Sequence, residues 1–330
     1  MLMKRRPLGR TGHTVSAIGL GCMGMSEFYG PHDDAQSLET LAAALEYGID
    51  FFDTADTYGA GHNEQLLGQF LKTRRDKVTV ATKFGIVREP GVYERRIDNS
   101  PGYIQTACDR SLERLGIDQV DLYYAHRRNP AVPIEEMVGA MADLVSAGKV
   151  RFLGLCEISP ATLRRACAVH PIAAVQSEYS LWSRDPEQEM LDTCIELGVS
   201  FVAYSPLGRA FLTGAVTSPD ALAPDDFRRQ NPRFQAEAMA RNKELVDALA
   251  VFATAHAAKP AQLALAWLLA KHDHVIPIPG TKRRHFLAEN AEAVDIELSV
   301  HDVAALDAMF TPHRVVGERY RPEGMVGIES

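Results

Sequence analysis

The sequence predicts an α/β fold: a (β/α)8 barrel, or TIM barrel, with an N-terminal β-hairpin and a C-terminal helix. Eight short apolar runs alternate with longer segments that have the period of a helix. Near-continuous apolar runs are typical of parallel strands that are buried on both faces. No linker and no second core interrupt the alternation, and barrels often reach 330 residues as one unit. We therefore expect residues 1–330 to form a single barrel domain.

The predicted elements can be assigned in order along the chain. Residues 4–15 are expected to form the hairpin and residues 301–311 the final helix, which a polar tail follows. Serine followed by proline, at 100–101 and at 159–160, predicts two helix starts, because serine caps helices and proline suits their first turn. The longest connection, residues 206–235, is expected to be functional. The eight strands are predicted at residues 17–20, 49–53, 78–83, 120–124, 150–155, 173–176, 201–204 and 275–278.

Composition and charge exclude several classes of function. The net charge of −8 argues against nucleic acid as a partner, because phosphate binding requires a basic face. No stretch approaches the roughly 20 apolar residues of a membrane span, and no early apolar run is long enough for a signal peptide. A cytoplasmic location is therefore expected. The cysteines are scattered and odd in number, which predicts neither a disulfide framework nor a metal site.

A glycine pattern after the first predicted strand is also typical of another fold. Gly19, Gly21 and Gly24 match the G-x-G-x-x-G fingerprint of dinucleotide-binding Rossmann folds. In a Rossmann unit the helix begins within the motif, so that its N-terminus faces the pyrophosphate. Here a loop follows, and the next helix is not expected before about Asp34. We therefore interpret the glycines as residues that let the first loop turn at the barrel mouth.

Four polar side chains fall at the ends of three neighbouring predicted strands. Asp53 and Tyr58 follow the second strand, Lys83 ends the third and His126 follows the fourth. Strand ends meet at one end of a barrel, where barrel active sites lie. A single aspartate or histidine in such a place is more often structural, but four together predict a catalytic group.

The chemistry of these four residues suits the reduction of a carbonyl. Tyrosine has an ordinary pKa near 10, and a neighbouring Lys83 ammonium would lower the pKa of Tyr58, which helps it to donate a proton. Asp53 would keep the lysine charged and oriented, while His126 would hydrogen-bond the carbonyl oxygen. None of these residues supplies electrons, so reduction requires a hydride cofactor.

The motifs taken together resemble those of the aldo-keto reductase superfamily, and of its bacterial and plant branch in particular. The resemblance extends from about Arg5 to Phe310 and rests on GLGCMGMSEFYGP, FFDTADTYG, NEQLLG, ATKFG, DLYYAHR, QSEYSLWSRDPE, YSPLGRAFLTG, IPGT and LAEN. It implies a barrel that binds extended NADPH without a Rossmann fold and that reduces an aldehyde or ketone to an alcohol. It also implies a catalytic tetrad, which falls here on Asp53, Tyr58, Lys83 and His126.

The resemblance also implies a set of cofactor contacts. Two positions depart from the usual pattern: Cys156 replaces a serine, and Phe286 stands where arginine or glutamine is common near the 2′-phosphate. Lys282, Arg283 and Arg284 would compensate, so we expect a preference for NADPH over NADH. The implied contacts are Cys156, Glu157 and Gln176 at the nicotinamide amide, Tyr204 on its ring, Ser205, Leu207, Gly208 and Arg209 at the pyrophosphate, Gly280, Thr281 and Lys282 at the 2′-phosphate, Glu289 and Asn290 at the adenine, and Met23 and Asp53 near the first strand ends.

Aromatic residues in the loops are candidates for the substrate pocket. Phe28 and Tyr29 lie in the first loop, and Trp182 follows the sixth strand. Apolar walls would favour aromatic or medium-chain aldehydes over charged sugars, because desolvating apolar groups is favourable. The sequence identifies neither the physiological substrate nor the oligomeric state.

Two other functions are open to a barrel with these residues. Potassium-channel β-subunits share the fold and the tetrad, which leaves a non-catalytic NADPH-sensing regulatory subunit as an alternative. Nothing in the sequence resembles a separate interaction domain, however. A Schiff-base lyase would use Lys83 as an amine nucleophile, which requires a lowered pKa. A neighbouring Asp53 would raise that pKa, so a reductase is the favoured interpretation.

Overall fold

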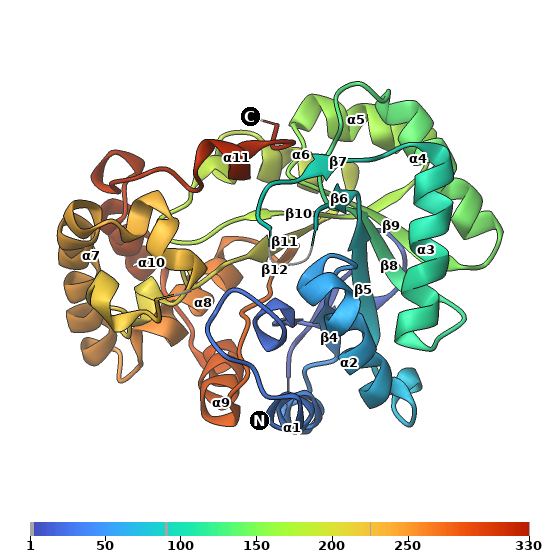
Figure 1. Cartoon of the computed structure of the whole chain (residues 1–330). Coiled ribbons are helices and arrows are strands. Elements are labelled where there is room, and N and C mark those ends of the chain that lie inside the picture. Colours follow the sequence, from blue (N-terminus) through green and yellow to red (C-terminus); the bar gives the residue numbers. More distant parts are fainter. Residues whose placement is uncertain (1–2, 90–91, 225, 330) are drawn as a thin grey trace.

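Eight parallel strands form the centre of the molecule in the computed structural model (Figure 1). The structure describes residues 3–89, 92–224 and 226–329. All eight predicted strands are confirmed, and only their ends differ; the first begins at Leu20 rather than at residue 17. Each is hydrogen-bonded to the next in chain order. The strands are β3 (Leu20–Gly21), β4 (Phe51–Asp53), β5 (Thr79–Phe84), β8 (Val120–Ala125), β9 (Val150–Cys156), β10 (Ile172–Glu178), β11 (Ser200–Tyr204) and β12 (Val275–Pro277).

The first and last strands of this sheet meet through two glycines. Gly21 pairs with Gly280 just beyond the end of β12. A Cβ on Gly21 would lie only 2.9 Å from the carbonyl oxygen of Ile278, so this close approach requires glycine. Gly21 therefore lets β3 close the barrel, in addition to the predicted turn of the first loop.

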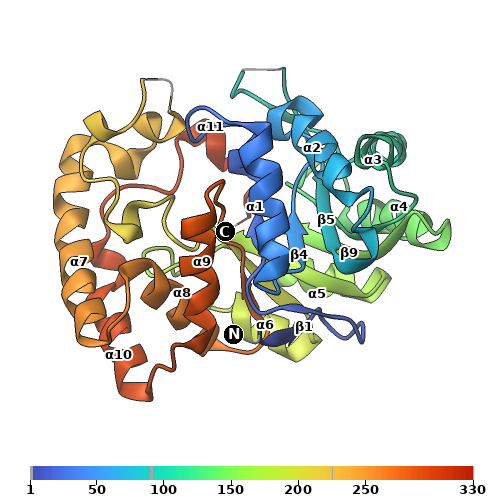
Figure 2. The ribbon, with the colours of Figure 1, turned by 90° about the horizontal axis from the view of Figure 1, so that it is seen from below.

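Helices cover the outside of the barrel, and Figure 2 shows α1 beside α9. Helix α1 begins at Asp34, as predicted, which excludes a Rossmann unit at the glycine pattern. Ser159 caps α5, as predicted, whereas the hydroxyl of Ser100 donates to Asp98 instead of capping α3. The α-helices of the described residues are α1 (Asp34–Glu46), α2 (His62–Leu71), α3 (Pro101–Leu115), α4 (Ile134–Ser146), α5 (Pro160–Val169), α6 (Met190–Leu197), α7 (Ala236–Ala255), α8 (Pro260–Lys271), α9 (Arg284–Glu292), α10 (Val300–Met309) and α11 (Pro322–Met325).

The N-terminal hairpin closes one end of the barrel. Strands β1 (Arg5–Pro7) and β2 (Thr14–Ser16) pair in antiparallel fashion, which confirms the predicted hairpin. Leu8 and Val15 are fully buried and pack against barrel side chains such as Phe51 and Leu122. These apolar side chains fill the barrel interior at the hairpin end, so a ligand could reach the barrel only at the opposite end.

Three segments surround that other end, the barrel mouth. Strands β6 (Ile86–Val87) and β7 (Arg96–Ile97) form a small antiparallel hairpin that the sequence did not predict. The long connection after β11 consists of short 3₁₀ turns, and its residue 225 lies outside the described residues. The polar tail after α10 returns to the mouth and contains α11, which lies near β6 and β7 (Figure 1).

Candidate active site

The structure brings the four strand-end side chains together at the mouth. Asp53 ends β4, Tyr58 begins a short 3₁₀ turn after it, Lys83 lies in β5 and His126 follows β8. The Lys83 ammonium donates to the Asp53 carboxylate, to the Thr54 carbonyl at 2.8 Å and to the Tyr58 hydroxyl at 3.2 Å. The ring of His126 meets the Tyr58 ring edge-on, with 5.8 Å between the ring centroids.

Burial and neighbouring charges set the protonation of this group. Burial alone would lower the pKa of Lys83, but Asp53 and Tyr58 outweigh burial and raise it. Burial raises the pKa of Tyr58 by more than Lys83 lowers it. Lys83 is therefore charged and Tyr58 protonated at neutral pH. Lys83 lowers the pKa of Tyr58, as the sequence predicted, but this offsets only part of the rise that burial causes.

His126 is held in its neutral form. Burial lowers its pKa well below the ordinary value, and the charges of Lys83 and Arg127 lower it further. Its Nδ1 atom is buried and has no hydrogen-bond partner among the described residues. A neutral imidazole beside Tyr58 can donate one hydrogen bond to an oxygen placed between the two side chains.

A cavity of about 420 Å³ opens at this group. Tyr58 and His126 contribute to its lining. Gln176 also donates to Asp53 at 2.8 Å, which links the tetrad to the residues implied for the cofactor. Most of those residues line the same cavity: Met23, Asp53, Gln176, Tyr204, Ser205, Leu207, Arg209, Gly280, Thr281 and Lys282.

The other residues implied for the cofactor lie outside the cavity lining. Glu157 accepts hydrogen bonds from the Tyr204 hydroxyl at 2.6 Å and from Arg319, so its carboxylate is already engaged. Gly208 packs against the indole of Trp182, where a Cβ would lie 2.6 Å from the ring. The residues outside the lining are Cys156, Glu157, Gly208, Glu289 and Asn290.

Residues 17–310 match the model of the Aldo/keto reductase family. This chain belongs to that family. It is 46% identical over 314 residues to an aldo-keto reductase of Schizosaccharomyces pombe whose name specifies NADP(+), covering 94% of this chain and 92% of that protein. It is 44% identical over 315 residues to a probable aldo-keto reductase of Glycine max, covering 95% and 90%. The predicted membership of this oxidoreductase family is confirmed.

Solved structures with similar folds include other aldo-keto reductases. The glycerol dehydrogenase AKR11B4 from Gluconobacter oxydans has a TM-score of 0.85 at 26% identity, covering 94% of this chain and 97% of that chain. The aldo-keto reductase AKR11C1 from Bacillus halodurans has a TM-score of 0.79 at 28% identity, covering 98% and 99%. The predicted barrel fold is thereby confirmed. Within the described ranges, no helix combines the length and apolar character needed to cross a membrane.

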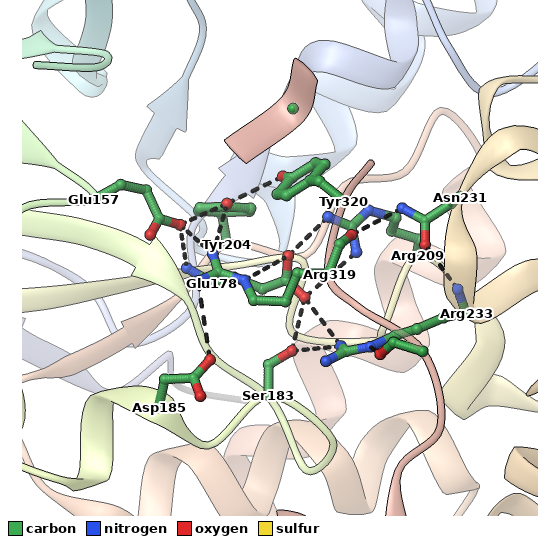
Figure 3. A network of polar contacts seen from close by, with 12 residues as sticks. Glu157, Glu178, Ser183, Asp185, Tyr204, Arg209, Asn231, Arg233, Arg319 and Tyr320 are labelled. Atoms are coloured by element: carbon green, nitrogen blue, oxygen red, sulfur yellow. Dashed lines mark hydrogen bonds and ion pairs between the residues drawn. The ribbon is translucent and has the colours of Figure 1, made fainter. Parts of the chain in front are cut away.

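In this aldo-keto reductase a buried ion network joins the loops of the mouth (Figure 3), and the sequence did not predict it. Glu178, at the end of β10, is fully buried and contacts Arg209 at 2.7 Å, Arg233 at 3.4 Å and Arg319 at 3.6 Å. Burial would raise the pKa of Glu178, but the three arginines lower it to about 2. The charged carboxylate therefore ties the loop after β11 to the C-terminal tail.

The tail completes the wall of the cavity. Arg319 donates to Glu157, and the Tyr320 hydroxyl lies 3.0 Å from the Tyr204 hydroxyl (Figure 3). Tyr320 also lines the cavity, with the Arg209 guanidinium 4.6 Å from the centre of its ring. The adjacent Arg319 and Tyr320 in a polar tail could have indicated a functional contact, but their partners Glu157 and Tyr204 lie more than 100 residues earlier. Sequence reasoning therefore missed them.

Two of the three predicted substrate residues line the cavity. Phe28 and Tyr29 do so, and the ring of Phe28 packs against Phe227 at 5.1 Å and Tyr93 at 6.5 Å between centroids, which forms an aromatic wall. Trp182 does not line the cavity. Its indole is buried beneath the loop after β11 and is stacked on another aromatic ring 5.0 Å away. The structure therefore places Trp182 behind the wall of the cavity, against Gly208.

Proposed function

We propose that this chain reduces an aldehyde or ketone to an alcohol with NADPH as cofactor. The observation that carries the proposal is the hydrogen-bonded series Asp53, Lys83 and Tyr58, with His126 beside it, at a cavity. NADPH supplies the hydride when it is bound. A small carbonyl compound as substrate and a cytoplasmic location are part of this proposal.

The residues around the cavity fit NADPH. Tyr204 offers an aromatic ring and Gln176 a side-chain amide, and both line the cavity that contains Tyr58. The loop at 280–283 leads directly into α9, and helix N-termini attract phosphate groups. Arg283 adds a cationic side chain to the same stretch. A relative whose name specifies NADP(+) supports this choice of cofactor.

Each tetrad residue has a separate role in the proposed reaction. Tyr58 donates its hydroxyl proton to the carbonyl oxygen, and the Lys83 ammonium, 3.2 Å away, stabilises the phenolate that remains. Asp53 orients the lysine through its carboxylate. His126 donates a hydrogen bond to the same carbonyl oxygen and fixes its direction.

The two alternative functions have less support. A Schiff-base lyase needs an uncharged lysine as its nucleophile. Although burial favours the uncharged form, Asp53 outweighs it and holds the pKa of Lys83 above its ordinary value. No observation on the described residues favours a sensing role without catalysis.

Replacing Tyr58 with phenylalanine tests the proposal, because the change removes the hydroxyl and keeps the ring. We expect kcat for 4-nitrobenzaldehyde to fall by about 10²–10⁴, since the transition state loses its proton donor. The Kd for NADPH, measured by fluorescence, should stay the same. Tyr47→Phe, at the end of α1 and outside the cavity lining, is the matched control. Near-normal turnover by the Tyr58→Phe variant would contradict the mechanism.

A further inference from the structure

The cavity contains cations that the proposed reaction does not use. Arg88, Arg95 and Arg127 all line it. Arg88 is neutralised, because it donates to both carboxylate oxygens of Glu27, at 2.6 and 2.5 Å. Arg95 and Arg127 are different: among the described residues, no carboxylate lies at ion-pair distance from either guanidinium.

Most of the N–H groups of these two arginines are left without protein acceptors. Arg127 is only 5% exposed, yet its contact within the described part of the chain is one bond from Nη1 to the His126 carbonyl, at 2.7 Å. Arg95 donates from Nη2 to the Gly324 carbonyl at 2.8 Å. The Nε atoms of both are buried and have no partner among these residues. A guanidinium carries five N–H donors, so each arginine has several free for a ligand.

The two cations line the same cavity as Tyr58 and His126, and their charges act on each other and on the reacting group. Burial lowers the pKa of Arg95, and the charge of Arg127 lowers it further. Both arginines lower the pKa of His126. Burial would lower the pKa of Arg127, but Tyr204 and the Glu157 carboxylate raise it. That carboxylate already accepts hydrogen bonds from Tyr204 and Arg319, so it does not neutralise the two cations. An anion placed between Arg95 and Arg127 would relieve their mutual repulsion.

We propose that Arg95 and Arg127 form a subsite for a carboxylate or phosphate group carried by the carbonyl substrate. This inference rests on the proposed function, and it names the substrate class. The Arg95 guanidinium lies 5.5 Å from the centre of the Tyr93 ring, which belongs to the aromatic wall with Phe28. An aromatic aldehyde with an anionic substituent therefore matches both features. The expectation of purely apolar selectivity, drawn from the sequence, did not include these arginines.

A matched pair of substrates tests the subsite: 4-carboxybenzaldehyde and its uncharged methyl ester. We expect Arg95→Met and Arg127→Met each to lower the acid-to-ester ratio of kcat/KM by about tenfold or more, as for a lost hydrogen bond to a charged group. Arg96→Met is the control, because Arg96 is the next residue, its side chain is 66% exposed and it pairs with Asp98. This control should keep the wild-type ratio. 4-Formylphenyl phosphate, as a third substrate, separates phosphate from carboxylate.

A binding measurement keeps this test independent of turnover. Benzoate titrated by calorimetry into the protein loaded with NADP+ should bind, and both variants should weaken it by about tenfold. Arginine-dependent binding of benzoate without reduction of any carbonyl would support the subsite and contradict the reductase proposal. An unchanged ratio together with unchanged benzoate affinity in both variants would overturn the subsite. Loss of NADPH affinity in both, in place of benzoate affinity, would assign the arginines to the cofactor and overturn it as well.

Discussion

Lys282, Arg283 and Arg284 follow one another at the start of α9, yet each contacts a different part of the molecule. The Lys282 ammonium donates to carbonyls of the first loop, at 2.9 and 2.6 Å. Arg284 pairs with Glu46 on α1 at 3.1 Å. Arg283 lines the cavity and forms no ion pair within the described residues. Arg283 is therefore the cation that we propose to bind the 2′-phosphate that distinguishes NADPH from NADH.

Replacing Arg283 with methionine is expected to weaken NADPH binding about tenfold, because a hydrogen bond between charged groups is lost. NADH binding should change little, since NADH lacks the 2′-phosphate. Titration of the protein fluorescence with each cofactor measures both dissociation constants, and Arg284→Met serves as the control on the neighbouring residue. Equal affinities of the unmodified protein for the two cofactors would show that the expected preference is absent.

Tyr58 shows what can and cannot be predicted about a single residue from the sequence. The strand-end positions of Asp53, Tyr58 and Lys83 predict that they meet, because barrel strands end on one side. They also predict the direction in which Lys83 shifts the pKa of Tyr58. The opposing effect of burial is larger, and it depends on side chains far away in the sequence, such as His126. The net direction therefore requires the folded mouth.

The C-terminal tail is an element held by charge rather than by an apolar face. Arg319 contacts the buried acids Glu157 and Glu178. Farther along, Glu329 pairs with Arg128 at 2.5 Å and accepts a hydrogen bond from the Ser159 backbone N–H at 2.9 Å. Because these anchors are local polar contacts outside the barrel core, removing the buried one should release the tail without unfolding the barrel.

We expect Arg319→Met to increase amide hydrogen exchange in residues 317–329 by about a hundredfold, as for the loss of roughly 3 kcal/mol from a broken buried ion pair. Exchange in the barrel strands should change much less. Arg314→Met, which alters an exposed arginine just after α10, is the control. Hydrogen exchange with mass spectrometry reports both regions at once. Uniform loss of protection throughout the chain would mean that the tail does not open as a separate unit.

Elements that are stabilised by their own apolar pattern could be predicted from the sequence, whereas elements held by distant contacts could not. The barrel strands carry their own signal, since each is an apolar run buried on both faces. The β6 and β7 strands have two residues each and α11 has four, so they are too short to show such a pattern. They are held by contacts such as the bond from Arg95 to the Gly324 carbonyl, which joins positions 229 residues apart. Local sequence cannot predict contacts of that range.

Buried His126 couples the stability of the whole molecule to pH. In the folded chain burial, then Lys83 and Arg127, lower the pKa of His126 well below the ordinary 6.5. Below pH 6.5 the unfolded chain therefore binds a proton that the folded chain does not bind. The free energy of unfolding then falls as the pH decreases, by up to about 1.4 kcal/mol per pH unit for this one group.

Replacing His126 with glutamine should remove this contribution. We expect the wild-type free energy of unfolding, relative to that of the variant, to decline from pH 6.5 to pH 5, with a slope that steepens toward about 1.4 kcal/mol per unit. Urea unfolding at several pH values measures it, and His285→Gln, an exposed histidine on α9, is the control. Parallel pH profiles for the wild type and His126→Gln would contradict a neutral, buried His126.

That residues 1–330 form one domain stays a prediction, and cooperative unfolding in these experiments would support it.

The hairpin and the tail lie at opposite ends of the barrel, as β1 and α11 show in Figure 2, and this arrangement has a practical consequence. An affinity tag or surface linker joined after the tail would start near Arg128 and Ser159, at the end of the barrel where the cavity opens. A linker joined ahead of the hairpin would emerge from the plugged end instead. If the protein is immobilised on a bead or an electrode through the hairpin end, the barrel mouth stays open to the solvent.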